Sequence, residues 1–210
     1  MVKRIKKVTR GKVTRERKKI IVIGTEGQNK TEVLYFRELE KTQNRYHCIF
    51  THGNETDPVK IVRNTAKKSR EESLSFKDGD MAISVFDLDL DGSKRGQLEE
   101  AKEYAQKRNI DIVCSNPCFE VWYLEHFGYT TKPFASSTAV IKELGKKIPE
   151  YSKNACEFDL LYPKTAAAIK NCEKLDLYHQ GNNAADEFAN PRTDMYKVVR
   201  TIIGKEGEKT

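Results

Sequence analysis

Three aspartates spaced two residues apart, Asp87, Asp89 and Asp91, follow the apolar run Met81–Phe86. The run has the composition of a buried strand, in which successive side chains point to opposite faces of a sheet. If the strand continues through the aspartates, all three carboxylates lie on one face. Carboxylates held this close repel one another unless a cation lies between them. The spacing therefore predicts a divalent-cation site at the end of this strand.

Two other predicted strands also end on polar side chains. Glu26 lies just past the apolar run 19–24, and Asn116 lies just past the run 111–114. Glu120 follows Asn116 by one helical turn, in the first turn of a predicted helix rich in aromatic residues. Ligands of open α/β sheets bind at the carboxyl ends of the strands. We therefore expect these groups near the aspartates, with Asn116 either orienting a phosphate or water or capping the following helix.

The elements that must position these residues alternate between strands and helices. Short apolar runs predict strands over 19–24, 47–50, 81–86 and 111–114. Apolar residues at helical spacing predict helices over 29–41, 57–74, 97–108 and 119–127, and then only helices over 136–148, 163–177 and 193–203. This order predicts an α/β fold, a mainly parallel sheet flanked by helices, with a helical C-terminal extension.

The boundaries predicted from these patterns are a basic arm at 1–18, an α/β domain at 19–130, a helical extension on the same domain at 131–204, and a polar tail at 205–210. Residues 1–19 carry ten Lys or Arg and one Glu, whereas the whole chain has a net charge of +7. The net positive charge of the chain therefore comes from the arm. We expect the arm to be disordered alone and either to bind nucleic acid or to act only as a solubilising tail.

Composition excludes several classes of protein. No apolar run is long enough to span a bilayer, so we expect no membrane association. The N-terminus is basic, but no apolar segment of signal-peptide type follows it, so we expect a cytoplasmic location. The five cysteines are an odd number without the spacing of a disulfide framework, which predicts reduced thiols. The four histidines are scattered, so a zinc site is not expected.

Two alternatives to a phosphoryl-transfer site can be read from the same residues. The segment 87–92 begins like a calcium loop, but Leu98 stands where the twelfth-position Glu belongs, and a strand rather than a helix precedes it. The segment 24–31 approaches the phosphate-binding pattern GxxxxGK[ST] between a strand and a helix. Its second glycine is replaced by Asn29, and Glu26 would place a carboxylate among the phosphates.

The third interpretation is a metal-dependent phosphoryl-transfer site, in which Glu26 and the aspartates hold Mg²⁺ or Mn²⁺ against a nucleic-acid phosphate. Hard cations prefer such oxygen ligands, and the metal both stabilises charge on the phosphate and activates a water molecule. Ordinary surface acids at strand–loop junctions would give the same local pattern. The coincidence of polar groups at three strand ends favours the metal site.

Three motifs together resemble the RloB-like proteins, a prokaryotic family often encoded near defence systems and similar to the Toprim fold. The motifs are Glu-Gly-x-x-x-Thr-Glu-x-x-Tyr-Phe at 26–36, Val-Phe-Asp-x-Asp at 85–89, and Ser-Asn-Pro-Cys-Phe-Glu-Val-Trp at 115–122. The resemblance covers about residues 19–203. It implies that Glu26, Asp87 and Asp89 are catalytic acids that bind Mg²⁺ or Mn²⁺, with Asp91 as a further metal ligand.

The resemblance implies a stand-alone, Mg²⁺-dependent Toprim-type nuclease that cleaves DNA or RNA in prokaryotic anti-phage defence, with a protein partner from a defence system. Oligomerisation stays open. Asn116 and Glu120 are expected to support the site. The alternatives are a non-catalytic nucleic-acid-binding or regulatory module with a degenerate metal site, or a P-loop-type NTPase. The residues expected to contact nucleic acid are Lys18, Lys19, Lys30, Lys94 and Arg95.

Overall fold

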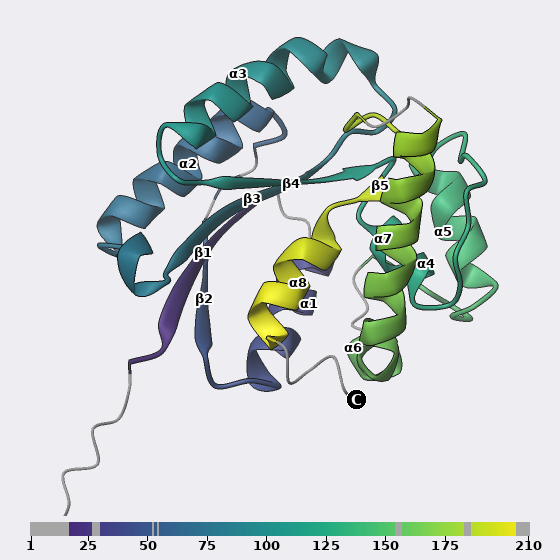
Figure 1. The fold of residues 1–210 in the computed structure, drawn as a ribbon, viewed down its shortest axis with the longest axis horizontal. Coiled ribbons are helices and arrows are strands. Elements are labelled where there is room, and N and C mark those ends of the chain that lie inside the picture. The colour runs from purple at the N-terminus through teal and green to yellow at the C-terminus, as the bar shows by residue number, and fades with distance from the viewer. Residues whose placement is uncertain are drawn as a thin grey trace, which may run out of the picture.

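A computed structural model describes residues 17–26, 30–51, 53, 55–153, 157–182 and 186–204, without the side chain of residue 30. Five strands form one sheet in the order β2-β1-β3-β4-β5 (Figure 1). The first four are parallel and the last pairs antiparallel with its neighbour. Their bounds are β1 Lys19–Thr25, β2 Tyr46–Phe50, β3 Met81–Asp87, β4 Asp111–Asn116 and β5 Arg192–Thr193. The predicted α/β class with a mainly parallel sheet is confirmed.

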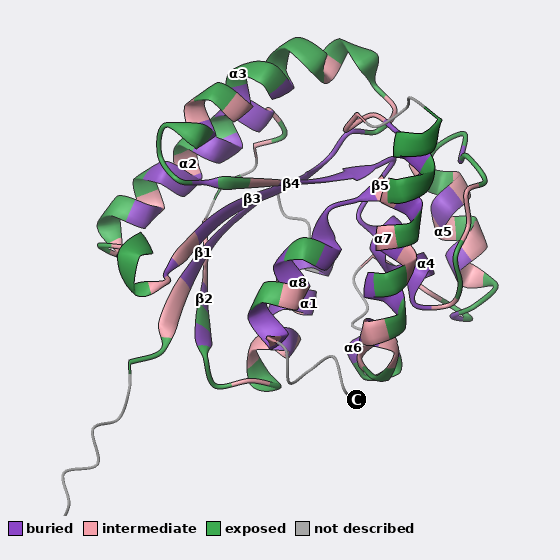
Figure 2. Ribbon diagram, in the orientation of Figure 1, coloured by how far each residue is buried: buried purple, intermediate pink, exposed green. Residues whose placement is uncertain are grey.

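Helices cover both faces of this sheet (Figure 1). Side-chain alternation along β3 produces two cores. Ala82 and Phe86 pack with apolar residues of α2 (Pro58–Glu71) and α3 (Arg95–Gln106). Ile83 and Val85 pack on the opposite face. The elements that contribute to this second core include α1 (Lys30–Lys41), α4 (Glu120–Glu125), α5 (Ser137–Gly145), α6 (Phe158–Leu161), α7 (Thr165–Gly181) and α8 (Met195–Ile203). Figure 2 shows the result, a buried sheet between helices that are exposed on their outer sides.

Local sequence signals explain where the helices begin. At the start of α2, the Asp57 side chain accepts a hydrogen bond from Lys60 N at 3.0 Å, and Pro58 occupies the first helical turn. Ser136 caps α5 in the same way, by accepting from Ala139 N at 3.2 Å. The predicted helices therefore form, with ends that differ by a few residues from the predicted ranges.

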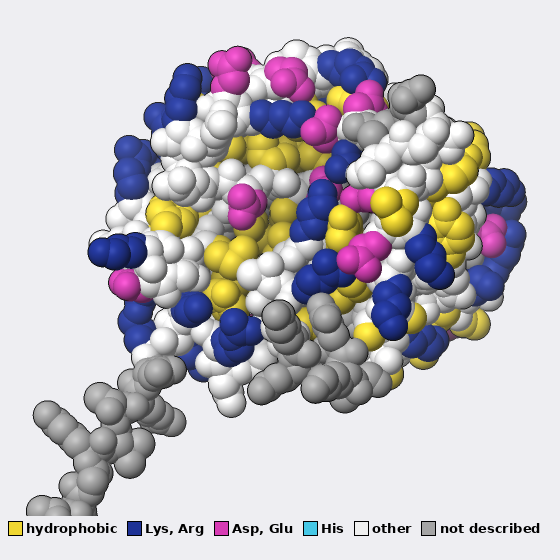
Figure 3. All heavy atoms as spheres, in the orientation of Figure 1, with side chains coloured by type: hydrophobic (Ala, Val, Ile, Leu, Met, Phe, Trp, Pro, Cys, Tyr) yellow, Lys and Arg dark blue, Asp and Glu magenta, His cyan; other side chains and the backbone are white. Residues whose placement is uncertain are grey.

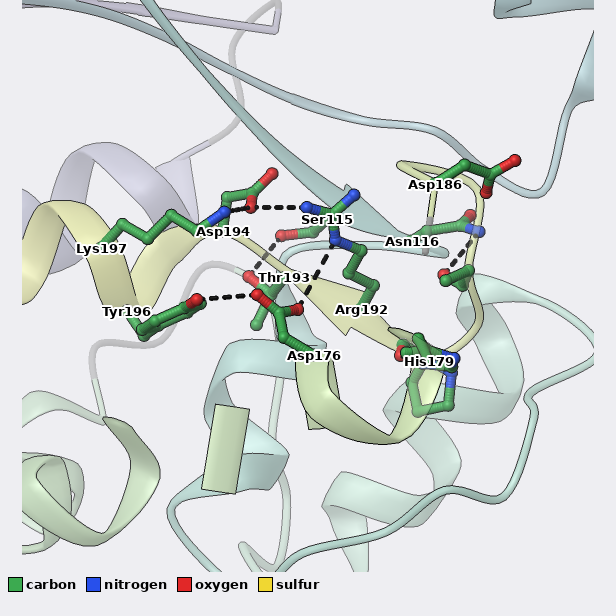
Figure 4. A network of polar contacts seen from close by, with 12 residues as sticks. Ser115, Asn116, Asp176, His179, Asp186, Arg192, Thr193, Asp194, Tyr196 and Lys197 are labelled. Atoms are coloured by element: carbon green, nitrogen blue, oxygen red, sulfur yellow. Dashed lines mark hydrogen bonds and ion pairs between the residues drawn. The ribbon is translucent and has the colours of Figure 1, made fainter. Parts of the chain in front are cut away.

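The expectation of an exclusively helical C-terminal segment is wrong, because β5 adds a fifth strand to the sheet. Its two residues carry no apolar run, so hydrophobic periodicity could not identify it. The side chain of Thr193 shares a hydrogen bond of 2.9 Å with Ser115 on β4. Arg192 lies between two carboxylates, 3.8 Å from Asp176 Oδ1 on α7 and 3.0 Å from Asp194 Oδ1 beside α8 (Figure 4). These contacts join the late segment to the edge of the sheet.

Within the described ranges, no helix combines the length and apolar character that crossing a membrane requires. Four cysteines are buried free thiols: Cys48, Cys114, Cys118 and Cys172. Cys156, the tail 205–210 and residues 1–16 of the basic arm lie outside the described residues.

Candidate functional site

Glu26 and Asp87 meet at the carboxyl edge of the sheet. Because β1 and β3 are adjacent and parallel, with Thr25 paired to Val85, Glu26 is level with Phe86, one residue before Asp87 at the end of β3. Asp87 N donates a hydrogen bond to Glu26 Oε1 at 3.3 Å. The side chain of Asp87 is almost fully buried, and Glu26 is half-buried. The structure therefore brings these two residues together at the carboxyl edge of the sheet.

Two further carboxylates come from helices. Glu32 lies in the first turn of α1 and Glu120 is the first residue of α4, and these residues are 2% and 1% exposed. Burial raises the pKa of Asp87 well above its usual range, and the negative charges of Glu32, Glu26 and Glu120 raise it further. We refer to Glu26, Glu32, Asp87 and Glu120 as the carboxylate cluster.

Burial and mutual repulsion also raise the pKa of two other members. The pKa of Glu26 is raised, first by loss of hydration and also by the charge of Asp89, against the opposing effect of Lys94. The pKa of Glu32 rises to about 7, mainly because the side chain is buried and partly because Glu120 and Glu26 are close. A cluster of this kind takes up either protons or a cation near neutral pH.

Cationic and hydroxyl groups surround the cluster. Lys94 Nζ lies 3.1 Å from Asp87 O and 2.9 Å from Asp89 Oδ2. Lys153 Nζ lies 3.9 Å from Glu120 Oε1, and the Tyr151 hydroxyl donates to the same oxygen at 3.1 Å. The other oxygen, Glu120 Oε2, is buried and has no hydrogen-bond partner among the described residues. The two lysines compensate part of the negative charge and leave this oxygen available to a ligand.

The prediction that all three aspartates share one face is wrong. β3 ends at Asp87, and the φ angles of Asp89 and Leu90 are 51° and 59°, so the alternation of a strand stops there. Asp89 is about half-exposed and accepts from Ser137 Oγ at 3.2 Å besides its contact with Lys94. Asp91 is exposed and accepts from Ser93 N at 2.9 Å, as the cap of a short 3₁₀ turn. Asp89 therefore lies at the margin of the cluster, and Asp91 belongs to the turn.

Asn116 has a structural role that differs from both expectations. Its side-chain oxygen accepts from Leu90 N at 3.1 Å, and its amide nitrogen donates to Phe188 O at 2.8 Å and Ala189 O at 3.2 Å. It does not cap the next helix, which begins at Glu120. Asn116 instead fixes the turn after β3 to the segment before β5. Figure 4 shows Asn116 near Ser115, at the edge of the sheet where β5 pairs with β4.

The predicted nucleic-acid contacts are not gathered at the cluster, with the exception of Lys94. Arg95 is exposed, pairs with Asp186 at 2.9 Å and lies over the Phe188 ring. Lys18 and Lys19 stand at the amino end of β1, about 20 Å from its carboxyl end, given the rise of a strand per residue. The side chain of Lys30 lies outside the described residues.

The structure gives little support to a phosphate-binding P-loop in the segment 24–31. A Cβ atom at Gly24 would collide with Thr65 Oγ1, so this glycine is explained by the close packing of α2 on β1. The hydroxyl of Thr31 donates to Lys153 O and is thereby occupied. Residues 27–29, which would form the centre of such a loop, lie outside the described part.

The donor set of the cluster fits Mg²⁺ or Mn²⁺, since it consists of carboxylate oxygens. One of these, Glu120 Oε2, is buried without a hydrogen-bond partner among the described residues. In the described part of the chain, no three Asp, Glu, His or Cys side chains are already arranged around a common ion position. The ammonium group of Lys94 supplies the positive charge next to Asp87 O and the Asp89 carboxylate. Binding of an ion between Glu26 and the aspartates therefore requires side-chain rotation and movement of Lys94.

Sequence reasoning missed Glu32 as a member of the cluster, although a signal was present. Glu32 lies three, four and seven residues before the buried Tyr35, Phe36 and Leu39, so it shares their helix face. An acidic residue on an apolar helix face is a marker of a buried functional group. Nothing in the sequence pattern indicated Tyr151 or Lys153, because they follow α5 in a segment without periodicity.

The sheet order and the acids at its carboxyl edge define an α/β protein consistent with a Toprim-like fold. The family model described as RloB-like protein matches residues 21–202, and the chain therefore belongs to the RloB-like protein family. No curated protein and no solved structure matches the chain.

Proposed function

We propose that this RloB-like protein is a metal-dependent nuclease that cleaves phosphodiester bonds of DNA or RNA. One observation carries the proposal: Asp87, buried at the end of β3, is surrounded by three other carboxylates that raise its pKa. A fold that only needed stability would not place these charges together, because each costs free energy when it is buried beside the others. A divalent cation bound to the cluster would offset that cost.

In this proposal Glu26 and Asp87 hold Mg²⁺ or Mn²⁺, with Asp89 and Glu120 close enough to join after side-chain rotation. The ion would stabilise charge on the phosphate and activate a water molecule. Glu32, with a pKa of about 7, is suited to exchange a proton near neutral pH. Lys94, beside Asp89, and Lys153, beside Glu120, add positive charge where a phosphate would bind.

The proposed biological setting is prokaryotic anti-phage defence in the cytoplasm, together with a protein partner. This part of the proposal rests on the resemblance of the three motifs to RloB-like proteins.

The test is cleavage of labelled single- and double-stranded DNA and RNA in Mg²⁺, Mn²⁺ or EDTA. We expect metal-dependent cleavage that Asp87→Asn and Glu26→Gln each reduce at least ~100-fold, as for removal of a group that stabilises the transition state. Asp91→Asn is the matched control, because that carboxylate caps a surface turn, and it should retain activity. Equal cleavage by all variants would contradict the site assignment.

The second candidate function is a non-catalytic nucleic-acid-binding module. It is favoured by the absence, among the described residues, of three side chains already arranged around an ion. It predicts binding of nucleic acid without cleavage under any metal condition, with affinity unaffected by Glu26→Gln.

A further inference from the structure

A hollow of about 450 Å³ lies outside the carboxylate cluster, at the far end of α5. Its wall is partly aromatic, from Phe127, Tyr129 and Phe134, and partly basic, from Lys132, Lys146 and Lys147. Figure 3 shows basic and hydrophobic side chains next to one another at the edge of the molecule where α5 lies. The size falls within the range of pockets that bind small ligands.

The charges of this hollow favour an anion. Lys146 pairs with Glu143 at 2.6 Å, and the lysines at 132 and 147 also act on that carboxylate and help to lower its pKa. The charged side chains that line the hollow are therefore one acid, Glu143, and three lysines. Lys132 and Lys147 form no ion pair with a described residue that would compete with binding of an anion.

The aromatic groups favour a planar partner. Tyr129 is 43% exposed, whereas Phe134 is buried and Phe127 already has Lys164 Nζ over its ring at 4.2 Å. Gly128 beside it also lines the hollow and has a φ of 150°, and a Cβ there would meet nothing within 4 Å, so the backbone before Tyr129 is not covered by other groups. An exposed aromatic ring beside lysines is the combination that stacks a base and binds its phosphate.

The position of the hollow connects it to the carboxylate cluster. The first residue of α5, Ser137, donates to Asp89 Oδ1, while Lys146 and Lys147, just past its last residue, line the hollow. The helix has nine residues and is therefore about 14 Å long. A stacked strand advances about 3.4 Å per nucleotide, so about four nucleotides span this distance.

We propose that the hollow binds one nucleotide unit of a nucleic-acid strand whose phosphodiester lies at the carboxylate cluster, with its base on Tyr129 and its phosphate at Lys132 and Lys147. This inference deepens the proposed nuclease function and rests on it. It assigns the substrate as a strand with an accessible, unpaired base about four nucleotides from the cleaved bond.

Binding is measured separately from cleavage, by fluorescence anisotropy of labelled single-stranded DNA and RNA oligonucleotides with the full-length protein in EDTA. The triple variant Lys132→Gln/Lys146→Gln/Lys147→Gln should weaken affinity at least ~10-fold. The slope of log affinity against log salt concentration should become shallower by about 1.4, given ~0.7 for each of the phosphate contacts of Lys132 and Lys147. Tyr129→Leu should weaken affinity about fivefold or more, while Tyr129→Phe keeps the stacking ring and the affinity.

The matched control is Lys170→Gln/Lys174→Gln, two exposed lysines on α7, which should stay within twofold of the unchanged protein. Equal weakening by the control, unchanged affinity of the triple variant, or no binding by the unchanged protein would overturn the proposal. A free mononucleotide that binds more tightly than the strands would also overturn it, in favour of a small-molecule site. Loss of binding in the triple variant together with no cleavage under any metal would contradict the nuclease function but keep the nucleotide site.

Discussion

Asp87 ends β3 with its carboxylate buried beside three others, and the ionised form is therefore costly in the folded state. Asp87→Asn removes the charge and keeps the shape. Without metal at pH 7.5, we expect the unfolding temperature to rise by about 2–4 °C, which corresponds to ~1 kcal/mol in a chain of this size. Millimolar Mg²⁺ should stabilise the unchanged protein and not the variant.

Thermal unfolding with and without Mg²⁺ measures both effects. Equal stabilisation of both proteins by Mg²⁺ would contradict metal binding by Asp87.

Glu125 is a second buried acid, on α4, and neither of its carboxylate oxygens has a hydrogen-bond partner among the described residues. Burial raises its pKa from 4.5 to about 8. The protonated form is therefore favoured by folding. The stability that protonation of Glu125 contributes is complete below about pH 4.5 and is lost as the pH rises through 8.

Glu125→Gln should therefore flatten the pH dependence of stability. Between pH 6 and pH 8, the unfolding free energy of the unchanged protein should fall by about 2 kcal/mol more than that of the variant. Urea unfolding at both pH values measures this difference, and Glu32 titrates in both proteins and so does not affect it. Parallel pH profiles would show that Glu125 is not a buried neutral acid.

At the scale of elements, Asn116 at the end of β4 joins the turn after β3 to the segment before β5. Its oxygen accepts from the turn after β3 and its nitrogen donates to the segment before β5, so both halves of the amide are used. Asn116→Asp keeps the acceptor but loses the donor, and it adds a charge near the cluster.

We expect Asn116→Asp to destabilise the protein at least as much as Asn116→Ala, by about 2–4 kcal/mol, because buried carbonyls lose their donor. Denaturant unfolding of the two variants gives the comparison. If Asn116 were instead a metal ligand, the aspartate would keep or improve Mg²⁺-dependent stabilisation, and only the alanine would be harmful.

The elements of the parallel sheet could be predicted because each strand is a short apolar run and α2 carries a clear cap signal. The predicted pairing of Glu26 with Asp87 followed from the rule that ligands gather at the carboxyl ends of strands. The placement of Asp91 could not be predicted in this way, because Asp89 and Leu90 have left-handed backbone conformations that end the alternation of side chains along the strand. β5 was missed because a two-residue strand has no periodicity.

At the scale of the whole molecule, the basic arm starts from the end of the sheet opposite the carboxylate cluster. Arg17 is anchored there, 2.7 Å from the buried carboxylate of Asp80, and two backbone contacts and this arginine lower the pKa of that acid against the effect of burial. Residues 1–16 carry seven Lys or Arg. The described end of the arm, Arg17, therefore lies at the opposite edge of the sheet from the carboxylate cluster.

Removal of residues 1–16 leaves Arg17 and β1 intact. It should weaken binding to duplex DNA, and the slope of log affinity against log salt concentration should become shallower by at least ~2. The cleavage rate at saturating substrate should stay within a fewfold of the full-length value. Anisotropy titrations at several salt concentrations measure this slope. An unchanged slope would refute a role of the arm in binding nucleic acid.

The central claim is that the carboxylate cluster binds a divalent cation. The most direct test is the anomalous scattering of manganese in crystals soaked in Mn²⁺. We expect a peak about 2.0–2.3 Å from carboxylate oxygens of both Glu26 and Asp87, with the ammonium group of Lys94 displaced from Asp89. No peak at these residues at millimolar Mn²⁺, or a peak at Asp91 alone, would contradict the claim.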